Sequence, residues 1–169
     1  MRLLACTLLT ALLAASPAQA GELFGGIYAH AVDTPLSLDS EYEGGTDIQF
    51  GYRFDPVGRG LQPYAFAAVN TAGETSYAAA GLSYRFGQSI YVRPGLGLAV
   101  HTGSTRDFTT GDGIDFGSRI LFEPEIAVGA QVNERLSVEA SWVHMSHATL
   151  FSGQNPGIDN IGVRLNWRL

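Results

Sequence analysis

The sequence has no cysteine beyond residue 6 and no lysine at all. Cys6 lies within an N-terminal apolar run, so the chain after that run offers no thiol for a disulfide, a nucleophile or a metal site. All ten basic residues are arginines, against 16 acidic residues, and the net charge is −6. Because these arginines form no basic cluster, the charge balance argues against nucleic acid as a partner.

Long apolar runs are also scarce. The one clear run, residues 3–15, is too short for a spanning helix, which needs about 20 residues. It follows Arg2 and precedes Ala18-Gln19-Ala20, a small-x-small pattern. These features predict a secretory signal peptide over residues 1–20, cleaved after Ala20. The remaining 149 residues (169 − 20), residues 21–169, are about one domain in size.

Apolar and polar side chains alternate in eight runs after the predicted signal peptide, with turn residues between them. The links at 55–60, 87–88 and 133–135 are short, whereas those at 32–45 and 102–119 are long and polar. An even number of strands, with short turns at one end and longer loops at the other, is typical of an outer-membrane β-barrel. We therefore predict an all-β fold, an eight-stranded antiparallel barrel in the bacterial outer membrane, with strands over residues 23–31, 47–54, 61–70, 76–86, 92–101, 120–131, 136–146 and 159–169.

A soluble β-sandwich would show the same alternation, with the apolar face pointing inward. The signal peptide, the final amphipathic strand and the aromatic residues near strand ends favour the barrel. These aromatic residues are Phe54, Tyr84, Phe86, Trp142 and Trp167.

The interior of an eight-stranded barrel has room only for side chains. Buried charges must be paired, so we expect a mixed-charge plug rather than an ion pathway. Its predicted members are Asp47, Arg53, Arg85, Arg93, Glu125, Glu139, Arg164 and Arg168.

The closing hairpin, residues 136–169, carries three polar residues on its outward face. Side chains two apart share a face of a strand, so His144 and Ser146 continue the apolar row of Trp142. By the same parity, Asp159 lies on the row of Ile161. A spanning strand takes about 9–11 residues, which places His144 and Ser146 near the outer-leaflet head groups. They could form a polar rim above the hydrocarbon, or a base, hydroxyl and carboxylate that activate a serine nucleophile.

The other histidines have simpler interpretations. His30 and His101 lie near strand tops, where the sequence places no acid or nucleophile with them, so we predict rim or loop residues. His147 points inward by alternation. It is either an interior hydrogen-bonding residue or a group that supports the neighbouring Ser146.

The closing hairpin resembles the lipid A 3-O-deacylase family, PagL. The resemblance rests on the pair His144-Met145-Ser146, the loop Asn155-Pro156-Gly157 and the acid Asp159. It implies an eight-stranded outer-membrane barrel with a membrane-facing triad that removes the 3-linked hydroxyacyl chain from lipid A. Two positions depart from the family pattern. The family acid is usually Glu, so we expect the loop to bring the shorter Asp159 closer to His144. The residue after the serine is usually Asn, and here it is His147.

We therefore expect a serine esterase whose partner is lipid A, or lipopolysaccharide, of the outer leaflet. Ser146 is the predicted nucleophile, His144 the general base and Asp159 the acid that orients it, with Asn155 as oxyanion donor and His147 in support. No cofactor or metal is expected, and a homodimer is compatible with the sequence. The alternatives are a non-catalytic barrel that anchors or adheres, and a lipid A acyltransferase.

Overall fold

The computed structural model describes residues 21–37, 42–106, 113–150, 153 and 155–169. The predicted signal peptide lies outside these residues. Among the described residues, no helix is long and apolar enough to cross a membrane. The described strands are β1 (Glu22–Ala29), β2 (Thr46–Arg53), β3 (Leu61–Asn70), β4 (Tyr77–Tyr84), β5 (Phe86–Gly87), β6 (Ile90–His101), β7 (Ile120–Gln131), β8 (Leu136–Met145) and β9 (Ile158–Arg168).

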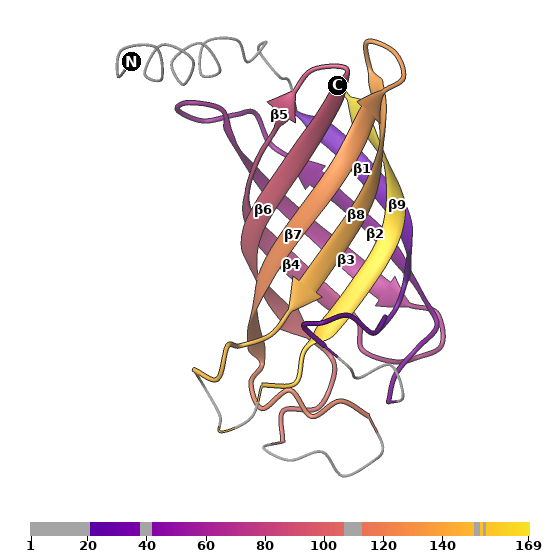
Figure 1. Ribbon diagram of the computed structural model, residues 1–169, viewed down its shortest axis with the longest axis vertical. Coiled ribbons are helices and arrows are strands. Elements are labelled where there is room, and N and C mark those ends of the chain that lie inside the picture. Colours follow the sequence, from indigo (N-terminus) through magenta and orange to yellow (C-terminus); the bar gives the residue numbers. More distant parts are fainter. Residues whose placement is uncertain (1–20, 38–41, 107–112, 151–152, 154) are drawn as a thin grey trace, which may run out of the picture.

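The strands close into a barrel in which every neighbouring pair is antiparallel (Figure 1). β1 pairs with both β2 and β9, and β4 pairs with β6. β5 also pairs with β6 and is separated from β4 only by Arg85, so β4 and β5 are two pieces of one long strand. The predicted eight-stranded antiparallel barrel is confirmed.

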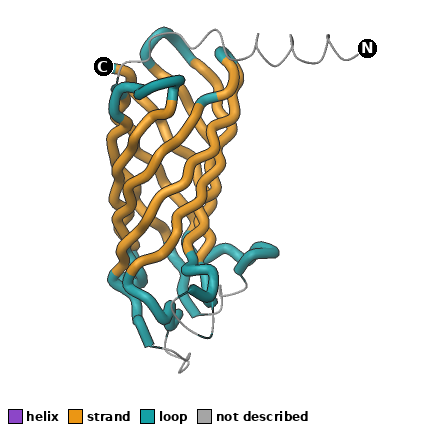
Figure 2. Tube along the Cα trace, turned by 90° about the vertical axis from the view of Figure 1, so that its left-hand side faces the viewer, coloured by secondary structure: helices purple, strands orange, loops and turns teal. Residues whose placement is uncertain are grey.

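The two ends of the barrel differ in their connections. The short turns and the C-terminus lie at one end, uppermost in Figure 1, and the longer loops lie at the other. Figure 2 shows the same tilted strands with loops gathered at both ends. β8 runs toward the long-loop end, so its last residues meet the β1–β2 and β8–β9 loops there.

The barrel interior contains a network of buried ion pairs beside buried aromatic residues such as Phe24 and Tyr64. Arg164 contacts Glu125 at 2.8 Å and Glu139 at 2.5 Å, while Arg93 contacts Glu22 at 2.8 Å. Of the predicted inward charges, six are buried: Asp47, Arg53, Arg93, Glu125, Glu139 and Arg164. Arg85 and Arg168 are half-buried. The outer face instead exposes apolar side chains such as Ile27, Phe50, Leu98 and Val163. Both faces thus match the predicted plug and lipid-facing surface.

β1 ends earlier than the alternation predicts, at Ala29 rather than residue 31. Ala31 has a positive φ of 51°, which no regular strand residue adopts. The chain therefore turns here, and the amide of Val32 donates to the carbonyl oxygen of Asp159 at 2.7 Å. This turn brings the start of the β1–β2 loop onto the closing hairpin.

Candidate active site

His144, Ser146 and Asp159 come together at the long-loop end of β8 and β9. The β8–β9 register sets His144 directly opposite Asp159. His144 Nδ1 lies 2.8 Å from Asp159 Oδ1, and His144 Nε2 lies 3.0 Å from Ser146 Oγ. Ser146 follows the end of β8, where its amide and carbonyl both bond to Phe122 of β7. The serine backbone is therefore fixed by a neighbouring strand.

The hydrogen bonds assign the roles of the two imidazole nitrogens. A carboxylate only accepts, so Nδ1 carries the hydrogen toward Asp159. In the neutral ring Nε2 is then the acceptor, and it faces the Ser146 hydroxyl. This is the order in which a serine is activated by a base that an acid orients.

The shorter acid reaches His144 through strand pairing. We expected the loop to bring Asp159 closer, but Asp159 is the second residue of β9 and lies within the β-ladder. Cross-strand Cβ atoms are only about 4.5–5.5 Å apart, so an aspartate spans the gap to a residue directly opposite. The register of the hairpin thus compensates for the missing methylene.

The Asp159 carboxylate receives further donors that the sequence did not indicate. The indole Nε1–H of Trp142 donates to Oδ1 at 2.7 Å, and the hydroxyl of Thr34 donates to Oδ2. The sequence predicts Trp142 only as a member of the aromatic residues near strand ends. Thr34 is 125 residues away in the chain, in the β1–β2 loop, and carries no recognisable motif.

The three residues share the outward parity but are covered. His144, Ser146 and Asp159 are exposed by only 9%, 8% and 0%. We expected an open lipid-facing row. The difference arises because the β1–β2 loop folds against the hairpin: besides the Val32 and Thr34 contacts, Ser37 Oγ donates to the carbonyl of Gly157 at 2.6 Å.

The two predicted supporting residues lie near the triad in sequence, with different surroundings. Asn155 is exposed, and its Oδ1 accepts from the amide of Thr149 at 3.3 Å. Asn155 and Ser146 both lie in the part of the chain that the structure describes, and no hydrogen bond joins their side chains. His147 is fully buried, and its carbonyl accepts from the amide of Leu150 at 3.0 Å.

His30 lies beyond the end of β1, beside two acids that the sequence did not indicate as its partners. Its Nδ1 is 3.0 Å from Asp47 Oδ2, and its Nε2 is 3.0 Å from Glu43 Oε2. Burial acts to lower the pKa of His30, but these two carboxylates raise it to about 9. With both nitrogens donating to carboxylates, His30 is an imidazolium that cannot serve as a general base at neutral pH. The predicted position, at the rim or in a loop, is confirmed, but the sequence did not indicate these two partners.

The charge of His30 predicts a pH-dependent stability. Its folded pKa of about 9 exceeds the unfolded value near 6.5, so its contribution is complete below about pH 6.5 and is lost as pH rises through 9. We expect the wild type to lose about 3 kcal/mol more than His30→Gln over this range. Unfolding of both proteins in detergent, followed from pH 6 to 10, measures this difference. Parallel curves would contradict it.

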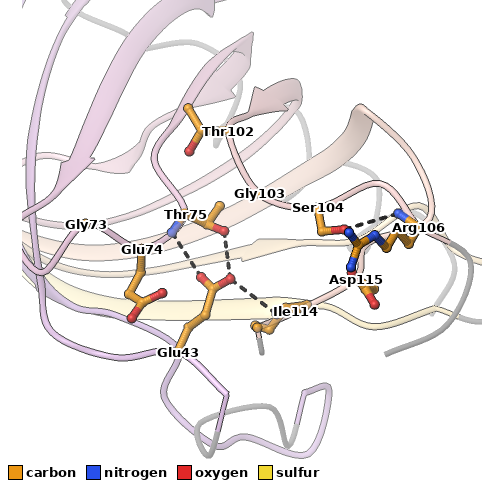
Figure 3. A pocket seen from close by; sticks show the side chains of 11 residues that line it. Glu43, Gly73, Glu74, Thr75, Thr102, Gly103, Ser104, Arg106, Ile114 and Asp115 are labelled. Atoms are coloured by element: carbon orange, nitrogen blue, oxygen red, sulfur yellow. Dashed lines mark hydrogen bonds between the residues drawn. The ribbon is translucent and has the colours of Figure 1, made fainter. Parts of the chain in front are cut away.

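Glu43 extends the His30 cluster into a link between three loops. Its carboxylate accepts from the hydroxyl and amide of Thr75 at 2.8 and 3.1 Å, and from the amide of Ile114 at 3.3 Å (Figure 3). Burial acts to raise the pKa of Glu43, yet the bonds from His30 and Thr75 leave it below the ordinary value. A polar pocket of about 280 Å³ opens here, lined by Glu43, Gly73, Glu74, Thr75, Thr102, Gly103, Ser104, Arg106, Gly113, Ile114 and Asp115.

This pocket is separate from the triad. Its lining comes from the β1–β2, β3–β4 and β6–β7 loops, and none of His144, Ser146 or Asp159 takes part.

His101, the last residue of β6, contacts neighbouring loop residues. Its Nε2 lies 2.7 Å from the carbonyl oxygen of Ser118, and its ring packs on Phe116. Neither the pocket nor His101 shows the serine–histidine–carboxylate series that the closing hairpin carries.

The fold and this geometry define a class of protein. It is a small outer-membrane β-barrel whose last hairpin holds a carboxylate, an imidazole and a serine hydroxyl in series. The sequence matches the family described as lipid A 3-O-deacylase (PagL) over residues 48–168. The chain belongs to this family, which confirms the resemblance seen in the closing hairpin. A search of curated proteins finds no match.

Solved structures show the same fold at low identity. The crystal structure of the outer membrane enzyme PagL is 21% identical with a TM-score of 0.65, covering 88% of this chain and 99% of that one. Neisserial surface protein A is 10% identical with a TM-score of 0.58, covering 91% and 100%. The N-terminal β-barrel domain of Pseudomonas aeruginosa OprF is 9% identical with a TM-score of 0.56, covering 89% and 100%.

Proposed function

We propose that this protein is an outer-membrane serine esterase that removes the 3-O-linked acyl chain of lipid A. The observation that carries the proposal is the continuous hydrogen-bonded series from Asp159 through His144 to Ser146. Membership of the lipid A 3-O-deacylase family supplies the substrate class. Lipid A would reach the site laterally, within the outer leaflet, because His144, Ser146 and Asp159 lie at the long-loop end of β8 and β9 and share the outward parity of these strands.

The proposed reaction has two halves. Ser146 Oγ attacks the carbonyl carbon of the ester as His144 Nε2 takes the hydroxyl proton. The tetrahedral intermediate collapses when the protonated His144 gives that proton to the sugar oxygen, which leaves as an alcohol. Water, deprotonated by the same imidazole, then attacks the acyl-enzyme and releases the free fatty acid and Ser146. Asp159 holds the Nδ1–H tautomer and stabilises the imidazolium in both halves.

The negative oxygen of the intermediate needs hydrogen-bond donors. We assign Asn155 to this role as a proposal, because its Oδ1 already accepts from Thr149 and its amide NH₂ is left as the donating group. Backbone N–H groups next to Ser146 would complete the site. His147, buried directly after the nucleophile, would hold this turn in place.

Gly157 lies so close to His144 and Ser146 that a side chain at this position would press on both residues. A Cβ at this position would lie 3.0 Å from His144 Cε1 and 3.4 Å from Ser146 Cβ. A displacement of a catalytic group by about 1 Å can lower the reaction rate by about 100-fold. We therefore expect Gly157→Ala to lower kcat by about 10- to 100-fold. Gly153→Ala is the matched control, because a Cβ there meets nothing within 4 Å. Equal rates for both variants in detergent-micelle assays would contradict this role.

Mass spectrometry of lipid A tests the proposal directly. The protein is expressed in a host whose lipid A carries 3-O-linked hydroxyacyl chains, alongside Ser146→Ala and the exposed-serine control Ser89→Ala. We expect the wild type and Ser89→Ala to remove one hydroxyacyl chain, and Ser146→Ala to remove none. The same acylation pattern for wild type and Ser146→Ala would exclude the esterase and favour a non-catalytic barrel. An added acyl chain would indicate an acyltransferase.

A further inference from the structure

The Asp159 carboxylate occupies an unfavourable place for an anion. It is fully buried, on the outward parity of a barrel wall, where the lipid environment penalises charge. Such a group stays ionised only if donors satisfy its oxygens. Oδ1 has two, the Nδ1–H of His144 and the Nε1–H of Trp142. Oδ2 depends on the hydroxyl of Thr34.

The Thr34 hydroxyl is itself oriented toward the acid. Its oxygen accepts from the amide of Leu36 at 3.0 Å, which leaves the hydroxyl hydrogen to point at Asp159 Oδ2. Thr34 and Ser37 exchange backbone hydrogen bonds of 2.8 and 3.2 Å, so the side chain projects from a closed turn. A donor held in this way needs no reorganisation when charge develops on the imidazole.

The segment that carries Thr34 is hydrogen-bonded to Asp159 and to its neighbour Asn160. The amide of Ala31 donates to Asn160 Oδ1 at 3.0 Å, and that of Val32 donates to the carbonyl of Asp159. The family match begins at residue 48, so family membership says nothing of this contact. The strand register fixes the backbone of Asp159, and His144 and Trp142 both donate to Oδ1. Thr34 donates to the other oxygen, Oδ2, and so completes the orientation of the short carboxylate.

We propose that Thr34 is a positioning residue for the active site, holding the Asp159 carboxylate in the orientation that aligns His144 with Ser146. The inference rests on the proposed esterase function. Thr34 does not reach the reacting atoms; it acts through Asp159. Its removal lets the carboxylate rotate away from Nδ1, so the defect falls on the chemical step and not on lipid binding.

The test compares Thr34→Val, which keeps the shape and removes the donor, with Thr34→Ser, which restores the donor. A hydrogen bond to a charged group corresponds to about 10- to 100-fold in rate. We expect Thr34→Val to lower kcat by this factor with KM within about twofold of wild type, and Thr34→Ser to recover most of the loss. Thr71→Val is the control, since it removes an exposed threonine's bond to the backbone carbonyl of Thr46, the first residue of β2.

Several outcomes would overturn the inference. These are a kcat for Thr34→Val within twofold of wild type, a change confined to KM, or a Thr34→Ser variant as impaired as the valine. If Thr34→Val does not fold, Thr34→Ala gives the same test without a branched side chain. Ser146→Ala, assayed in parallel, separates the two proposals: if it retains activity, the esterase function fails, whereas if it is inactive beside a fully active Thr34→Val, only the role of Thr34 fails.

Discussion

Replacing Ser146 with alanine is expected to lower kcat for ester hydrolysis by about 10⁶-fold, and His144→Ala by a similar factor. The serine hydroxyl is 3.0 Å from the imidazole nitrogen that would take its proton, so each residue is ineffective without the other. The double variant should therefore be no slower than either single variant. Hydrolysis of lipid A in detergent micelles, with released fatty acid quantified by mass spectrometry, measures all three rates.

The non-additivity is the informative part of that comparison. Independent effects would multiply, whereas two members of one catalytic unit share a single loss. Ser89→Ala, at an exposed position in a turn of the opposite barrel end, controls for loss of a serine. A double variant that is far slower than both single variants would show that His144 and Ser146 act separately, contrary to their bonded geometry.

Asp159→Asn is expected to lower kcat by about 10⁴-fold. The substitution keeps the size of the side chain but removes the charge that, in the proposed mechanism, stabilises the imidazolium. It also offers an amide NH₂ where Oδ1 now accepts from His144 and Trp142. The assay is the same hydrolysis measurement, with folding checked by the mobility of the unheated barrel in detergent gels.

Asp159→Glu separates charge from geometry at this position. The longer side chain keeps the carboxylate, but the cross-strand register leaves little room for another methylene between Asp159 and His144. We expect an activity between those of wild type and Asp159→Asn. An Asp159→Asn variant with more than a tenth of wild-type activity would remove Asp159 from the mechanism.

The barrel and the orientation of the triad could be predicted because both follow from strand alternation. Alternation alone placed His144, Ser146 and Asp159 on one face, and the family resemblance rested on the same residues. The β8–β9 register then brings them into contact. Because local periodicity determines these features, a single sequence is enough to predict them.

The surroundings of the triad could not be predicted in this way. Thr34 meets Asp159 because Ala31 turns the β1–β2 loop onto the hairpin, and His30 meets Glu43 and Asp47 because the loops fold over the barrel end. Loop residues have no periodicity to reveal their partners. The same loop explains why the triad is covered, although its parity predicted an exposed row.

The most direct test of the proposed active site is covalent labelling of Ser146. A fluorophosphonate, which reacts with activated serines, is incubated with the purified barrel in detergent, and the modified peptide is sequenced by mass spectrometry. The triad predicts a single adduct on Ser146 that is lost in His144→Ala and in Ser146→Ala. Labelling of a different serine, or equal labelling of Ser146 in His144→Ala, would contradict the account.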